Sequence, residues 1–167
     1  MKRFVVFFAV LFVCFSNVQA DGLKIGSPAP DFTAPASDGS QVHLAQWLDR
    51  APIVIFFYPK DDIPDSAQEA CNFRDNFTGF RDMKVTVFGV SYDSISSHKK
   101  FIMKYHLPFL LLSDLYHSIA KDYDAGGLLS PSQYTFIIDK HGTIVYINRS
   151  VNPVTQSLEL QNALAQL

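Results

Sequence analysis

Two residue types along the chain have the chemistry for covalent catalysis, a cysteine and a serine five residues apart. Cys71 is the only cysteine after residue 20, and Ser66 precedes it in the same helical pattern. A thiolate is a nucleophile on its own, whereas a serine hydroxyl needs a base and an orienting group. Ser66 has no Gly-x-Ser-x-Gly motif around it and no histidine within thirteen residues. We therefore interpret Ser66 as a helix N-cap, with Glu69 closing a capping box.

The remaining polar candidates favour structural roles. The five histidines show no spacing typical of metal ligands: His43, His98, His106, His117 and His141. The Asp61-Asp62 pair is interpreted as a solvated turn, and Gly126-Gly127 as a turn without a phosphate-loop context. The sequence thus predicts no metal ion and no cofactor.

Both candidate residues follow a stretch typical of a central strand. Residues 53–58 are a continuous run of β-branched and aromatic side chains, the pattern of a strand buried on both faces. Pro59 ends this run, because proline cannot donate to a strand ladder. A polar loop and a helix over 66–80 follow, in which Ala70, Phe73 and Phe80 recur at helical spacing and face inward. This order places the start of the helix at the carboxyl end of the strand, a common place for chemistry.

The rest of the chain alternates between apolar runs and amphipathic segments. We expect further strands at 32–34, 42–44, 85–90, 109–112, 134–139 and 143–147. We expect further helices at 44–48, at 97–105, after Ser113-Asp114, and at 158–167 with Leu160, Ala163, Leu164 and Leu167 inward. Strand–helix units followed by a hairpin and a helix predict an α/β domain with a mixed central sheet flanked by helices.

The site region closely resembles the peroxiredoxins, in particular their Q-type or bacterioferritin-comigratory branch. The matching residues are Pro59-Lys60-Asp61-Asp62, Pro64, Glu69-Ala70-Cys71 and Asn72-Phe73-Arg74-Asp75, together with the opening Gly26-Ser27-Pro28-Ala29-Pro30-Asp31-Phe32. The resemblance covers roughly residues 24–167. It implies a thioredoxin-like fold with the N-terminal hairpin typical of peroxiredoxins. It also implies a thioredoxin-dependent peroxidase that reduces hydroperoxides with electrons from a thiol.

The residues that carry the family's chemistry differ in this sequence. Ser66 stands at the position of the peroxide-attacking cysteine, Ile63 at that of the threonine, and Gln133 at that of the arginine. Pro59 is kept, and Cys71 matches the resolving cysteine. Serine has no oxidation ladder equivalent to that of a thiol. We therefore expect a degenerate thiol-peroxidase site that is non-catalytic or much weakened.

Cys71 leaves two interpretations open. In a helix, positions five residues apart differ by about 500° and ~7.5 Å of rise, so a residue at 66 cannot reach Cys71 without unwinding. With no intrachain partner, Cys71 is either a small buried hydrophobic side chain or a lone reactive thiol. In the second case the protein reduces hydroperoxides through Cys71.

The first twenty residues predict export. Lys2 and Arg3 precede an apolar run too short to span a membrane, and Ala20 suits cleavage. We expect a signal peptide at 1–20, a domain at 21–167, and a secreted or periplasmic location. The domain has 14 − 2 = 12 basic and 16 acidic residues, a balance of −4 without a basic patch. We expect no nucleic-acid partner, no membrane contact after cleavage, an unidentified protein partner if the site is inactive, and a monomer or homodimer.

Overall fold

A five-stranded sheet forms the centre of the protein in the computed structural model, which describes residues 22–167. Its strands are β3 (Ile53–Phe57), β4 (Thr86–Ser91), β5 (Leu110–Ser113), β6 (Thr135–Ile138) and β7 (Ile144–Asn148), in the order β5-β4-β3-β6-β7. The β3–β4 and β4–β5 pairs are parallel, and the β3–β6 and β6–β7 pairs are antiparallel. The mixed sheet therefore has β3 at its centre.

Strand β3 is buried along its whole length because it contributes to two separate cores. Ile53, Ile55 and Phe57 point to one face of the sheet, and Val54 and Phe56 to the other, as the two-residue period of a strand requires. All five residues are at most 1% exposed. The apolar run in the sequence thus reflects a strand covered on both sides.

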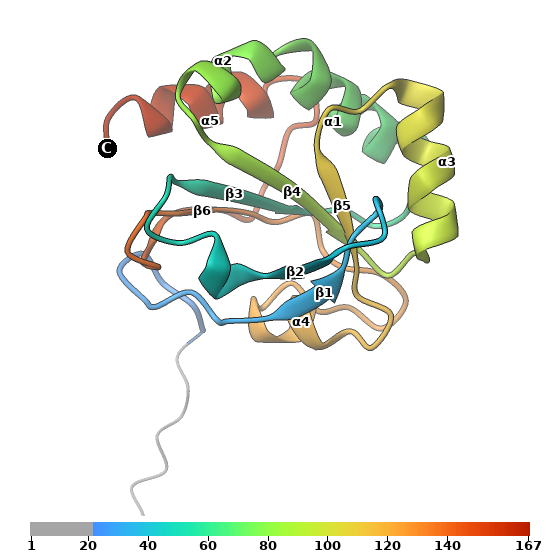
Figure 1. The fold of residues 1–167 in the computed structure, drawn as a ribbon, viewed down its shortest axis with the longest axis horizontal. Helices are drawn as coiled ribbons and strands as arrows, with labels where there is room; N and C mark the ends of the chain where they lie inside the picture. The colour runs from blue at the N-terminus through green and yellow to red at the C-terminus, as the bar shows by residue number, and fades with distance from the viewer. Residues whose placement is uncertain (1–21) are drawn as a thin grey trace, which may run out of the picture.

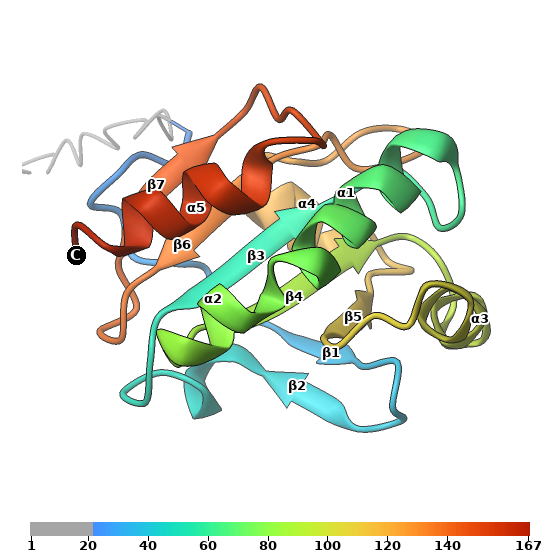
Figure 2. The ribbon, with the colours of Figure 1, turned by 90° about the horizontal axis from the view of Figure 1, so that it is seen from above.

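The two faces carry different covers (Figures 1 and 2). One face is covered by α1 (Pro64–Asp75), α2 (Phe77–Asp82) and α5 (Gln156–Leu164), with α3 (Ile95–Tyr105) beside β5. The other face is covered by α4 (Ser118–Asp122) and by the hairpin of β1 (Thr33–Pro35) and β2 (Gln41–His43), which continues into a single 3₁₀ turn at Leu44–Gln46. The predicted α/β architecture with a mixed, helix-flanked sheet is confirmed.

Several predicted boundaries were wrong. The helix expected over 66–80 is two helices that break at Asn76, whose backbone is not helical. The first of these helices begins at Pro64, two residues before Ser66, the predicted N-cap. At the C-terminus, α5 ends at Leu164, so Leu167 is exposed rather than inward. Helix ends depend on local capping and tertiary contacts, which the apolar period does not record.

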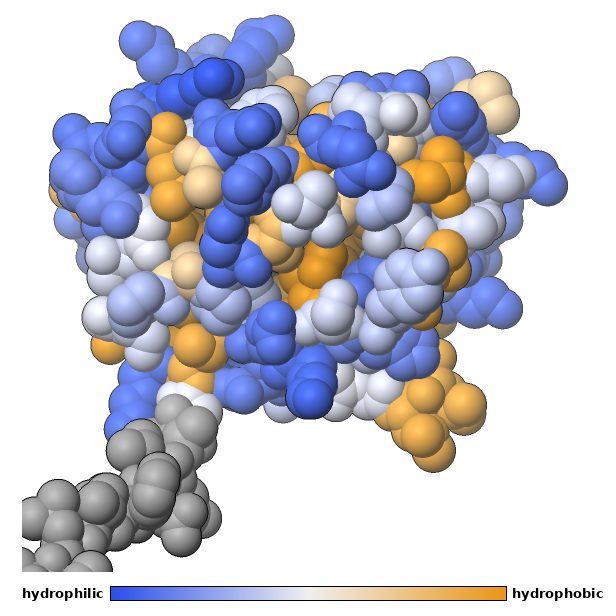
Figure 3. Space-filling view, turned by 60° about the horizontal axis from the view of Figure 1, so that its bottom comes forward, coloured by the Kyte–Doolittle hydropathy of each residue, from blue (hydrophilic) through white to orange (hydrophobic). Residues whose placement is uncertain are grey.

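The predicted signal peptide at residues 1–20 lies outside the described residues. Across residues 22–167, no helix is long and apolar enough to cross a membrane. Exposed large apolar side chains, among them Tyr116, Leu128 and Leu129, occur on this surface. On the face shown in Figure 3, apolar areas are small and separated by hydrophilic side chains.

Gly89 lies at a crowded point of the sheet. It pairs with Phe56 on β3 and Leu111 on β5, and a Cβ atom at this position would lie 2.7 Å from both side chains. We expect Gly89→Ala to lower the free energy of unfolding by about 1–3 kcal/mol, since a packed core has no room for an added methyl group. Urea denaturation measures this change. An unaltered midpoint would show that the two side chains can move aside.

Candidate functional site

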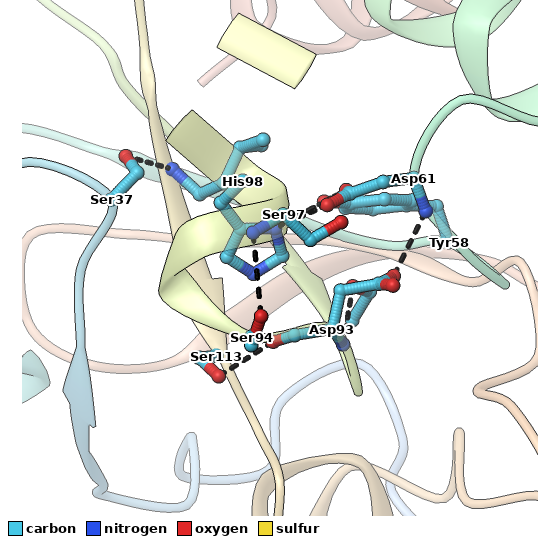
Figure 4. A network of polar contacts seen from close by, with 10 residues as sticks. Ser37, Tyr58, Asp61, Asp93, Ser94, Ser97, His98 and Ser113 are labelled. Carbon is cyan, nitrogen blue, oxygen red and sulfur yellow. Dashed lines mark hydrogen bonds and ion pairs between the residues drawn. The ribbon is translucent and has the colours of Figure 1, made fainter. Parts of the chain in front are cut away.

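The loop that leaves β3 is held by a buried polar network (Figure 4). The Tyr58 hydroxyl donates a hydrogen bond to Asp61 Oδ1 at 2.7 Å, and His98 Nδ1 lies 3.0 Å from Asp61 Oδ2. His98 is fully buried, and the side chain of Asp61 is 3% exposed. Burial, and after it the Asp61 charge, raise the pKa of Tyr58 well above its ordinary value. The phenol therefore stays protonated and keeps donating to Asp61.

A second carboxylate fixes the backbone of the same loop. Asp93 Oδ2 accepts hydrogen bonds from the Asp61 backbone N–H at 2.8 Å and from the Ser91 hydroxyl at 2.9 Å. The network thus ties the loop after β3 to the loop after β4 and to α3. The prediction of a solvated Asp61-Asp62 turn was wrong for Asp61, which is buried, and right only for Asp62, which is exposed and paired with Lys104.

The helix that follows begins differently from the sequence prediction. Ile63 is the N-cap residue of α1, without a side-chain capping bond, and Pro64 is the first helical residue. Proline is favoured there because its missing N–H would have no helical partner and its φ angle is already helical. Ser66 therefore lies inside the first turn instead of capping it, and the prediction of an N-cap was wrong.

The inward face of α1 is partly polar. Its buried residues are Ser66, Glu69, Ala70 and Phe73, which occupy positions i, i+3, i+4 and i+7. Ser66 Oγ and Glu69 Oε1 are both buried and have no hydrogen-bond partner among the described residues. The spacing alone could have placed Glu69 on this face. The capping-box interpretation assigned it to the helix end instead.

Glu69 is a buried carboxyl group without a cation. Gln133 Nε2 donates to Glu69 Oε2 at 3.2 Å. Burial raises the pKa of Glu69 to about 8, and the amides of Gln133 and Gln156 only partly oppose this shift. At neutral pH the side chain is therefore mostly a neutral acid, as expected when no positive charge compensates for lost solvation.

The other predicted site residues lie around these two clusters. Pro59 directly follows Tyr58 in the loop, Gln133 precedes β6, and Cys71 is half-buried in the middle of α1. The pKa of the Arg74 guanidinium is raised, first by its hydrogen bond with Asp75 and then by its interaction with Cys71. Burial partly opposes this shift. Within residues 22–167, no group of three or more His, Cys, Asp or Glu side chains could hold a metal ion.

An apolar groove lies elsewhere on the protein. It has a volume of about 470 Å³ and lies between α3 and the β1–β2 turn, with Ile102, Met103 and Phe109 among its lining residues. Ser66 and Glu69 do not line it. The polar cluster of α1 is therefore enclosed by packing instead of opening into this groove.

Comparisons with known proteins agree with the fold. The family model described as the AhpC/TSA family matches residues 25–147. Peroxiredoxin Q of Oryza sativa subsp. japonica, a chloroplastic protein, is 41% identical over 126 residues, which are 73% of this chain and 57% of the relative. The chain thus spans little more than half of the plant relative. The putative peroxiredoxin bcp of Coxiella burnetii is 36% identical over 73% of this chain and 85% of its own length.

Solved structures show the same likeness. The peroxidoxin BcpB of Mycobacterium tuberculosis superposes with a TM-score of 0.82 at 26% identity, over 87% of this chain and 98% of its own. The bacterioferritin comigratory protein of Xanthomonas campestris, which has alkyl peroxide reduction activity, gives a TM-score of 0.77 at 27% identity, over 81% and 90% of the two chains.

The Asp61 network should contribute to folding far more than the neighbouring exposed ion pair. We expect His98→Leu to lower the free energy of unfolding by about 3 kcal/mol, because it leaves a buried carboxylate without its partner. Tyr58→Phe removes one hydrogen bond and should cost about 1–2 kcal/mol. Lys104→Ala, which breaks the exposed pair with Asp62, is the matched control and should change little. Equal effects of His98→Leu and Lys104→Ala in urea denaturation would contradict this assignment.

Glu69 should make the protein less stable as pH rises. Below pH 4.5 the carboxyl is protonated in both the folded and the unfolded chain. Between 4.5 and 8 mainly the unfolded chain ionises, so stability is lost as pH approaches 8. For this group the free energy of unfolding should fall by up to about 1.4 kcal/mol per pH unit. Glu69→Gln should flatten that slope in urea titrations at pH 5, 6.5 and 8, and an unchanged slope would assign the dependence to other groups.

Proposed function

Because this chain belongs to the AhpC/TSA family and resembles its peroxiredoxin Q and bacterioferritin-comigratory members, we propose that it is an exported peroxiredoxin-like protein whose thiol-peroxidase site is degenerate. The observation that carries the proposal is Ser66, at the position of the family's attacking cysteine, whose buried hydroxyl has no hydrogen-bond partner among residues 22–167. A serine there cannot pass through a sulfenic acid. The chain then acts by binding a protein partner.

Two further positions support the same conclusion. Ile63, at the position of the family's threonine, is the cap residue of α1 and has no hydroxyl to orient a peroxide. Gln133, at the position of the arginine, donates an amide hydrogen to Glu69 and supplies no positive charge. A site without the thiol at position 66, a hydroxyl at position 63 and a cation at position 133 lacks the nucleophile and both groups that would polarise an O–O bond.

Export is part of the proposal and has its own support. Residues 1–20 have the basic start, apolar run and small final residue of a signal peptide. Cleavage leaves residues 21–167 as the mature domain, with Cys71 as its lone thiol in an oxidising compartment. Secretion and a periplasmic location are both compatible with this sequence pattern. A monomer and a homodimer are both compatible with this fold.

One observation favours a second candidate function. Cys71 is half-buried rather than fully enclosed, and Arg74 interacts with it from one turn further along α1. In this alternative Cys71 attacks the hydroperoxide, the O–O bond breaks, an alcohol leaves, and Cys71 becomes a sulfenic acid. One external thiol then converts the sulfenic acid to a mixed disulfide with release of water, and a second thiol restores Cys71.

Peroxide consumption distinguishes these functions. We expect residues 21–167 to consume hydrogen peroxide and cumene hydroperoxide no faster than a Cys71→Ser variant, with excess dithiothreitol as reductant. The combined change Ile63→Thr, Ser66→Cys and Gln133→Arg should raise turnover about tenfold or more, because it restores the nucleophile and the cation.

The controls separate loss of chemistry from loss of fold. Circular dichroism and urea denaturation should show that every variant is folded before its rate is compared. Turnover by the unaltered chain well above that of Cys71→Ser would overturn the degenerate-site proposal and favour the Cys71 peroxidase. A folded triple variant that stays inactive would mean that positions beyond these three have also changed.

A further inference from the structure

The C-terminal helix is attached to α1 through a polar seam. Asn72 Nδ2 donates to the Val154 carbonyl oxygen at 2.7 Å, and Asn72 Oδ1 accepts from the Ser157 N–H at 3.0 Å. One turn further on, Gln161 Nε2 donates to the Asn76 carbonyl oxygen at 2.9 Å. The seam therefore consists of side-chain amides that bond across the helix pair, and Figure 2 shows α5 lying alongside α1 and α2.

Glu69 lies at the end of this seam where α5 begins. Gln156 and Ser157, the first two residues of α5, are fully buried. Gln156 interacts with Glu69 and donates to Thr135 of β6. Gln156 Oε1 and Ser157 Oγ have no partner among residues 22–167, like Glu69 Oε1 itself. A carboxylate here would be covered by α5 with only two amides to compensate for its lost hydration.

No charged side chain faces Glu69 from the elements packed against it. The side chains around Glu69 are all uncharged. They are Ser66 on α1, Thr135 on β6, Gln133 just before β6, and Gln156 and Ser157 on α5. The acidic residue of α5, Glu159, is exposed and bonds Thr155. Tyr146 of β7 also lies near α5, and burial, followed by the Glu159 charge, raises its pKa above the ordinary value, so it stays neutral between pH 5 and 8. Glu69 is thus the buried carboxyl group described at this contact.

Helix α5 spans nine residues and pairs with no strand of the sheet, so its contacts with the sheet are those of side chains alone. Its buried apolar side chains are Leu160 and Leu164. Local openings are favoured in elements that have few buried apolar contacts.

We propose that α5 is a pH-controlled latch, which stays docked on α1 while Glu69 is protonated and is released when Glu69 ionises. Release exposes the carboxylate to water, which removes the cost of its burial, and it uncovers the apolar surface under Leu160 and Leu164. The latch goes beyond the proposed function and does not depend on it, because its argument uses no peroxidase chemistry.

Amide hydrogen exchange of the purified protein, followed by NMR between pH 5 and 8, tests the latch. Protection factors, corrected for the pH dependence of intrinsic exchange, should fall for α5 amides by about tenfold per pH unit. They should stay below those of β3 amides at every pH, since β3 opens only with the whole domain. Glu69→Gln, which keeps the shape of the side chain, should remove the pH dependence in α5.

Gln133→Arg provides the complementary variant. It places a cation beside Glu69 and should keep the α5 amides protected up to pH 8. Equal pH dependence in Glu69→Gln and the unaltered protein would overturn the proposal. So would α5 amides that exchange as slowly as those of β3, because release would then require global unfolding. Peroxide turnover does not enter either readout, so failure of the latch and failure of the proposed function are distinguishable.

Discussion

The burial of β3 on both faces is the constraint on which the rest of the structure depends. A strand with no exposed residue must be covered by one layer on each side, and the protein supplies helices on one side and a hairpin with α4 on the other. The chain must also leave this strand through a polar loop directly beneath α1. Burial of polar groups near the end of β3 follows from that path, and each of them needs a partner or costs free energy.

Two polar clusters lie near this end, and they differ in how well they are satisfied. Around Asp61 both carboxylate oxygens and the backbone N–H have partners, and His98 Nε2 is the one buried side-chain atom of this cluster without a partner among residues 22–167. Around Glu69, four buried side-chain oxygens have no partner in the described part of the chain: those of Ser66, Glu69, Gln156 and Ser157. The Asp61 cluster supports the fold, whereas the Glu69 cluster contains Ser66 and Gln133, two of the positions at which we propose that the peroxidase site is degenerate. This division supports the proposal, because contacts that stabilise the scaffold must be retained even where the chemistry of a site is lost.

The neutral Glu69 connects the proposed loss of the peroxidase site with the pH dependence of the domain's stability. With glutamine at position 133, the buried carboxyl has an amide partner in place of a cation, and protonation becomes its lowest-cost state. The proposed loss of peroxidase chemistry and the proposed release of α5 thus share one physical origin, a missing positive charge. The lost activity and the helix release remain separate proposals, because the fold by itself determines neither the activity of a protein nor its regulation.

The sequence by itself determined the architecture and the local chemistry of the site positions. The apolar run of β3, the helical period of α1 and the hairpin signals sufficed for the α/β sheet, because these patterns report burial within one element. The cap of α1, the burial of Asp61 and the role of Glu69 were decided only by tertiary structure. Asp61 meets His98 across 37 residues, and Glu69 meets Gln133 across 64, so no local period records either pair. Whether a polar side chain is solvated or buried depends on which distant elements cover it, and that covering exists only in the folded chain.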